Sequence, residues 1–86
     1  MTDDLDVRRR RAAYRSHHRG TKEMDFLLGR FADQHLPAFL DAEMAQFEGL
    51  LELPDPTLQR WILSGAEPDQ SEFRTLIADI RVFHGL

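Results

Sequence analysis

The chain has 86 residues, a length that suits one domain with a single modest core and leaves little room for an enclosed active site. Hydrophobic residues make up 42% and charged residues 30%, as in ordinary soluble globular proteins, which excludes a disordered or membrane-spanning chain. Cysteine is absent and the net charge is −4, which excludes disulfides and thiolate metal sites and disfavours nucleic acid as the partner.

The first expected helix covers residues 3–18. Thr2 is its predicted N-cap, and acidic residues precede basic ones along it, an order that the helix dipole favours. A narrow apolar edge is formed by Leu5, Ala12 and Ala13. Gly20 is expected either to end this helix in the left-handed conformation or to begin the next one.

Two further helices are expected over residues 21–35 and 41–52. The first has the clearest apolar stripe of the chain, with the spacing of one helix face, made of Met24, Leu27, Leu28, Phe31, Ala32 and His35. Pro37 interrupts this pattern, and Asp41 is the predicted N-cap of the next helix. That helix is expected to bury Met44, Phe47, Leu50 and Leu51.

The last two helices are expected over residues 56–64 and 70–84. Asp55 is the predicted N-cap of the first, with Pro56 in its first position, and Gly65 marks its end. No segment alternates as a half-buried strand does. The prediction is therefore an all-α fold, a compact single-domain five-helix bundle over residues 1–86. Its expected core contains Leu27, Leu28, Phe31, Phe47, Leu51, Leu58, Trp61, Ile62, Leu76, Ile77 and Ile80.

No catalytic or metal-binding pattern is present in the sequence. His17 and His18 are adjacent and point about 100° apart on a helix, and the other two histidines lie in different expected helices. Phosphate-binding glycine loops and nucleophile motifs are also missing. We therefore expect no catalytic residue and no metal site.

Charge is distributed unevenly along the chain. Residues 7–22 carry seven Lys or Arg and no acid, whereas residues 26–86 carry four basic and ten acidic side chains. The basic run, which includes Arg8, Arg11 and Arg15, is either a nucleic-acid patch, a solvated helix face or a protein-docking face. The overall acidity and the single nearby aromatic residue, Tyr14, favour the last two.

Residues 19–25 place a glycine, a cation and two carboxylates at the joint between the first two expected helices. In one interpretation this run only ends a helix, with Glu23 favoured by the helix dipole and paired with Arg19. In the other, it faces a partner. Phe26 lies off the apolar stripe, so it is expected either to pack against the first helix or to be exposed for that partner.

Arg19, Gly20, Glu23 and Asp25 match the RGxxExD motif of the succinate dehydrogenase assembly factor 2 family, called SdhE in bacteria. The family's downstream pattern is matched by Leu50, Leu51, Glu52, Asp55, Leu58, Trp61 and Pro68. Order and spacing agree, and the chain resembles this family over roughly residues 5–82.

The resemblance implies a chaperone, not an enzyme, that binds the flavoprotein subunit of succinate dehydrogenase and promotes its covalent flavinylation. FAD is then carried by the partner and is not bound stably here. Arg19, Gly20, Glu23 and Asp25 are the expected partner-binding residues. Secondary candidates are Arg8, Arg11, Arg15, Lys22 and Phe26.

Two other functions stay open from the sequence: a protein that itself binds and delivers FAD, and a nucleic-acid or adaptor module that uses the basic helix. The N-terminus lacks the apolar stretch of a signal peptide and is too acidic for a transit peptide, so we expect a cytoplasmic bacterial protein without membrane insertion. We expect a monomer when the protein is free. Whether fumarate reductase flavoproteins are also clients is not decided by the sequence.

Overall fold

The computed structural model describes residues 4–86. The elements in chain order are α1 (Leu5–His17), α2 (Lys22–His35), η1 (Leu36–Ala38), α3 (Asp41–Leu51), α4 (Asp55–Ile62), η2 (Ser71–Phe73) and α5 (Arg74–Phe83). No strand occurs in this part of the chain, which confirms the all-α prediction. The expected helix ranges agree closely with the structure, except that the 3₁₀ turn η2 takes up the start of the last one.

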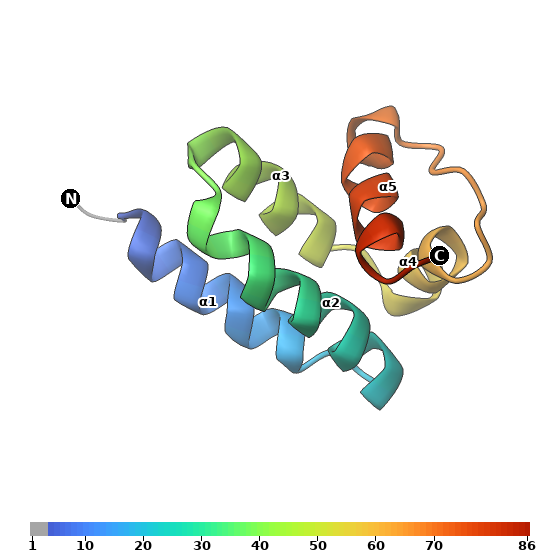
Figure 1. The fold of residues 1–86 in the computed structure, drawn as a ribbon, viewed down its shortest axis with the longest axis horizontal. Coiled ribbons are helices and arrows are strands. Elements are labelled where there is room, and N and C mark those ends of the chain that lie inside the picture. The colour runs from blue at the N-terminus through green and yellow to red at the C-terminus, as the bar shows by residue number, and fades with distance from the viewer. Residues whose placement is uncertain (1–3) are drawn as a thin grey trace.

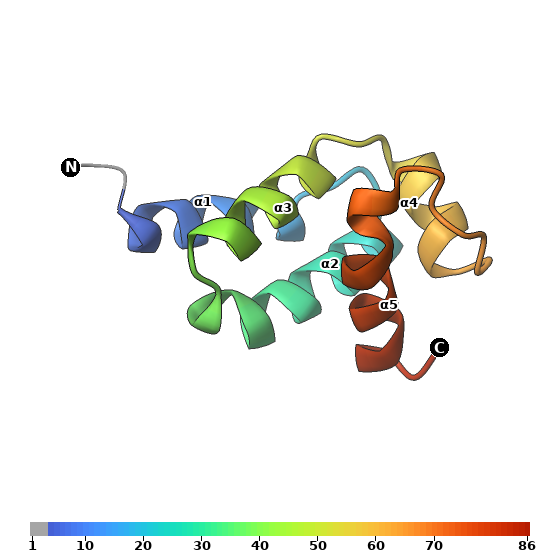
Figure 2. The ribbon, with the colours of Figure 1, turned by 90° about the horizontal axis from the view of Figure 1, so that it is seen from above.

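The helices form two packed groups. α1 and α2 lie side by side in opposite directions, and α3 returns along them (Figure 1). α4 and α5 pack at the end of the molecule where α1 joins α2, with α5 steeply inclined to α2 (Figure 2). The molecule is elongated, with extents of 40 × 26 × 22 Å. The joint between α1 and α2 is therefore the place where the two groups meet.

One hydrophobic core connects the two groups. All eleven residues of the expected core are buried, and so are Met24, Ala32, Met44, Leu50 and Phe73. Leu36 from η1 and Ala12 from α1 complete this cluster, with Leu5 and Ala13 packed at its edge. A single shared core confirms the single-domain prediction, because neither group buries its apolar face alone.

The starts of α1 and α3 differ from the sequence prediction. Asp4 is the N-cap of α1 and accepts a hydrogen bond from the Val7 N–H at 3.0 Å, while Thr2 lies outside the described residues. Leu40, not Asp41, is the N-cap of α3, and the Glu43 carboxylate accepts from its N–H. Asp4 thus satisfies one of the free amide groups in the first turn of α1, and Glu43 binds the N–H of the residue that precedes α3.

The other two corrections concern Gly20 and Asp55. Gly20 does not have a positive φ, so it is not a left-handed helix terminator; Gly65, with φ of 75°, does end α4 in that way, as predicted. Asp55 is the first residue of α4 and not its N-cap, which is Pro54. Its carboxylate is used for a tertiary contact instead, described below.

A glycine allows the close packing of α1 on α2. A Cβ at Gly29 would lie 2.5 Å from His17 Nδ1, closer than real Cβ contacts. His17 lies here because its Nε2 is 2.9 Å from Asp33 Oδ1. The seam between the two helices therefore has no room for a side chain at position 29.

Gly29→Ala should lower the free energy of unfolding by about 1–3 kcal/mol, because the His17 ring must move and lose its contact with Asp33. Gly49→Ala is the matched control, since its Cβ would meet the Phe73 ring at an ordinary 3.5 Å. Urea unfolding of both variants measures the difference. Equal stability of the two would contradict the packing argument.

Candidate functional site

Residues 18–21 link α1 to α2 and are held by side chains from α2. Thr21 is the N-cap of α2, and its Oγ1 accepts a hydrogen bond from the Met24 N–H at 3.1 Å. The half-buried Asp25 turns back toward the link, where its Oδ1 accepts from the Arg19 N–H. Asp25 thus fixes the link internally.

The side chain of Arg19 also points into the molecule. Its Nε donates to Asp55 Oδ1 at 2.9 Å, and its two terminal nitrogens donate to the carbonyl oxygens of Leu51 and Leu53, each at 2.7 Å. Only 11% of this side chain is exposed. The suggested Arg19–Glu23 pair is wrong, because the carboxylate paired with Arg19 is Asp55, which starts α4.

Gly20 is in contact with the same carboxylate. Its N–H donates to Asp55 Oδ2 at 3.0 Å, and a Cβ at position 20 would lie 3.0 Å from that oxygen. The absence of a side chain therefore lets Asp55 approach the backbone from inside. Gly20 is otherwise exposed.

Glu23 and its neighbours on α2 face outward. Glu23 is exposed, and its Oε1 accepts a hydrogen bond from Gln59 Nε2 on α4 at 3.1 Å. Lys22 is also exposed, with no ion-pair partner among residues 4–86. The outer surface of the joint thus consists of a bare backbone at Gly20 with a cation and a carboxylate beside it.

Phe26 extends this surface toward α5. Its side chain is 52% exposed, and its ring lies 5.6 Å from the ring of His84 and 5.2 Å from the guanidinium of Arg30. This exposure agrees with the second of the two alternatives expected from the sequence, a side chain available to a partner. An exposed aromatic ring braced by two side chains is a suitable anchor for a protein partner.

Two of the basic side chains of α1 pair with carboxylates of α3 or of the residue that follows it. Arg8 forms a two-pronged contact with Glu48 at 2.9 and 3.2 Å and reaches Asp41 at 2.8 Å; the hydrogen bonds with Glu48 raise the pKa of Arg8 above its usual range. Arg15 pairs with Glu52 at 2.7 Å. Arg11, by contrast, is exposed and has no ion-pair partner among the described residues.

A groove of about 400 Å³ lies beside Gly20 and is lined by Tyr14, Arg15, His18, Arg19, Gly20 and Asp55. The rings of Tyr14 and His18 are stacked with centroids 4.0 Å apart, and Tyr14 is 65% exposed. This pair of stacked rings was not predicted from the sequence. The i, i+4 spacing of Tyr14 and His18 could have predicted it, because side chains four residues apart are neighbours on a helix surface.

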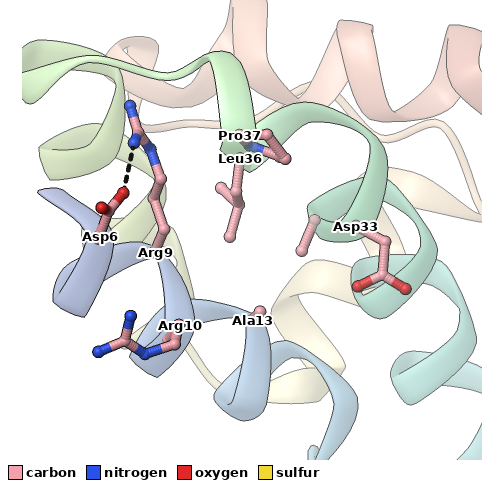
Figure 3. A pocket seen from close by; sticks show the side chains of 8 residues that line it. Asp6, Arg9, Arg10, Ala13, Asp33, Leu36 and Pro37 are labelled. Atoms are coloured by element: carbon pink, nitrogen blue, oxygen red, sulfur yellow. Dashed lines mark hydrogen bonds and ion pairs between the residues drawn. The ribbon is translucent and has the colours of Figure 1, made fainter.

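A second hollow, of about 380 Å³, lies at the other end of α1, between that helix and η1 (Figure 3). Arg9 lines one side of it, with one terminal nitrogen 3.1 Å from Asp6 Oδ1 and the other donating to the carbonyl oxygen of Phe39. Its buried Nε has no hydrogen-bond partner among residues 4–86. Through these contacts, Arg9 connects α1 to the segment that follows η1.

The four histidines lie apart and have separate partners. His18, His35 and His84 each contact a backbone carbonyl, and His17 contacts Asp33. Within residues 4–86 no three metal-binding side chains are grouped as a metal site requires. In the same part of the chain, no helix has the length and apolar character needed to cross a bilayer.

Comparison with known proteins gives a consistent family assignment. Residues 10–84 match the family model described as the flavinator of succinate dehydrogenase. The FAD assembly factor SdhE of Acetobacter pasteurianus is 36% identical over 96% of this chain and 80% of its own length.

Two further relatives extend the similarity. The SdhE protein of Coxiella burnetii, also named an FAD assembly factor, is 38% identical over 73% of this chain and 77% of its own length. The mitochondrial succinate dehydrogenase assembly factor 2 of Debaryomyces hansenii is 39% identical over 69% of this chain and 42% of its own length.

Arg19→Lys should lower the free energy of unfolding by about 2–4 kcal/mol, because one ammonium group cannot replace a planar fork that reaches Asp55 and two carbonyl oxygens. Arg15→Lys, four residues earlier and within α1, is the matched control, because its ion pair with Glu52 is largely exposed and contributes less than about 1 kcal/mol. Thermal and urea unfolding compare the two. A loss no greater for Arg19→Lys than for the control would contradict the internal role.

Proposed function

The chain belongs to the family described as the flavinator of succinate dehydrogenase, and we propose that it promotes the covalent attachment of FAD to the flavoprotein subunit of that enzyme. It does so as a non-catalytic assembly factor. The name FAD assembly factor, carried by relatives that align with most of this chain, supports this proposal.

The division of the RGxxExD residues between two roles is the observation that carries the proposal. Arg19 and Asp25 hold the joint from inside, whereas Gly20 and Glu23 are exposed on its outer surface. Rigid backbone with an exposed carboxylate suits protein recognition, because little conformational entropy is lost on binding. We therefore propose that Gly20 and Glu23 contact the flavoprotein and that Arg19 and Asp25 act through them.

Lys22 and Phe26, which lie next to Glu23 on α2, complete the proposed interface, and Arg11 on α1 is a further candidate. Phe26 supplies apolar area next to Glu23, and Lys22 and Arg11 supply cations that are not engaged by other described residues. Arg8 and Arg15 are less suited to contact a partner, because α3 already binds their guanidinium groups.

In the proposed mechanism, binding stabilises the flavoprotein conformation in which its own histidine faces its FAD. The chain must then bind that conformation more tightly than the alternatives, since only a difference in affinity shifts a population. FAD stays with the partner, and the bond forms there. A free monomer and a cytoplasmic location stay predictions, and the question whether fumarate reductase flavoproteins are further clients stays open.

The ion pairs that α1 forms argue against the nucleic-acid alternative. A phosphate-binding patch needs clustered free cations, but Arg8, Arg9 and Arg15 are bound by other residues of the chain. The adaptor alternative becomes part of the proposal itself, because the proposed function is protein binding.

Glu23→Ala should reduce covalent FAD on the coexpressed flavoprotein subunit and weaken the complex about tenfold or more, because the partner loses a charged hydrogen-bond acceptor. Flavin fluorescence of the denatured flavoprotein band measures the attachment, and titration calorimetry measures the affinity. Glu72→Ala removes a similarly exposed carboxylate from η2 and is the control.

If the unaltered chain neither binds the flavoprotein nor changes its flavin content, the proposed function is wrong. Wild-type attachment with the Glu23→Ala variant would contradict the proposed site alone. Titration of the purified chain with FAD tests the remaining alternative, direct FAD binding.

A further inference from the structure

We propose that Asp55 is a positioning residue for partner recognition: it holds Gly20 in the conformation that the flavoprotein binds. The inference rests on the proposed function. Asp55 lies at the start of α4, 35 residues from Gly20 in the chain, and none of its atoms needs to contact the partner.

The two oxygens of Asp55 have different donors. Oδ1 accepts from Arg19 Nε at 2.9 Å, and Oδ2 accepts from the Gly20 N–H at 3.0 Å. The Asp55 side chain is only 19% exposed, so water does not readily replace these bonds. One carboxylate thus fixes both the side chain of Arg19 and the backbone of the next residue.

This carboxylate also sets where α2 begins relative to α4. Glu23, in the first turn of α2, accepts a hydrogen bond from Gln59, which is one turn into α4. Without the Asp55 bonds, α4 would be held to this end of α2 by the exposed Glu23–Gln59 hydrogen bond, and Arg19 would be bound only to the carbonyl oxygens of Leu51 and Leu53. Gly20 and Glu23 would then no longer be presented together, and ordering them would reduce the affinity for the partner.

Packing within the protein explains why residue 20 is a glycine. Its missing side chain leaves room for Asp55 Oδ2, which a Cβ would meet at 3.0 Å. If the partner alone required glycine, a methyl group at position 20 would cost the same affinity whatever residue stood at 55. If Asp55 requires it, the cost depends on Asp55.

A first experiment measures affinity for the flavoprotein subunit by titration calorimetry. Asp55→Asn keeps the volume but turns an amide group toward one of the two donors, and roughly tenfold weaker binding is expected. Asp79→Asn, an exposed carboxylate of α5, is the control and should bind as the unaltered chain does. Unchanged binding by Asp55→Asn would overturn the inference.

A second experiment is a double-mutant cycle of Gly20→Ala, Asp55→Ala and the double variant, measured both in affinity and in urea unfolding. The alanine at 20 should weaken binding in the unaltered background and have little further effect once Asp55 is alanine. Additive effects on affinity would overturn the inference.

The unfolding cycle separates the two proposals, because it needs no partner. Additivity in unfolding contradicts the Asp55–Gly20 coupling, however the flavoprotein behaves. Coupling in unfolding, together with no binding of the flavoprotein by the unaltered chain, contradicts the proposed function and removes the recognition role of Asp55 with it.

Discussion

The ion pair between Arg19 and Asp55 connects the parts of this protein that would otherwise be separate. Arg19 lies in the link between α1 and α2, and its guanidinium also binds the last carbonyl oxygens of α3 and the segment that follows it. Four of the five helices therefore meet at one side chain. Since both partners are largely buried, the pair is protected from solvent and fixes distances as well as charge.

The charged side chains that are unevenly distributed along the sequence serve mainly to form ion pairs within the protein. The basic face of α1 meets the acidic face of α3, so that Arg8 and Arg15 neutralise Glu48 and Glu52 across the helix interface. Arg9 is held in the same way by Asp6 and a carbonyl oxygen. The cationic surface left for a partner is consequently smaller than the run of arginines indicates, and within residues 4–86 it includes Arg10, Arg11 and Lys22.

The motif that identifies the family combines two kinds of residue. Arg19 and Asp25 shape the joint, and Gly20 and Glu23 are presented by it. The proposed recognition surface is held by hydrogen-bonded side chains from α2 and α4, and not by contacts between the exposed residues. Asp55, which belongs to the downstream pattern, acts on the same joint and makes the two patterns one structural unit.

The helices and the core were predictable from the sequence alone, because both follow from local periodicity and from the breaks at Pro37, Pro54 and Gly65. The stripe from Met24 to Ala32 is buried as its spacing indicates, and RGxxExD lies at a helix joint as expected. Local sequence patterns did not predict the side chains that make contacts across the fold. Asp55 was expected to cap a helix, Arg19 to bind a partner, and Phe26 either to pack against α1 or to be exposed. Those roles depend on contacts between residues more than 30 positions apart, and only the packing of α4 and α5 against the joint decided them.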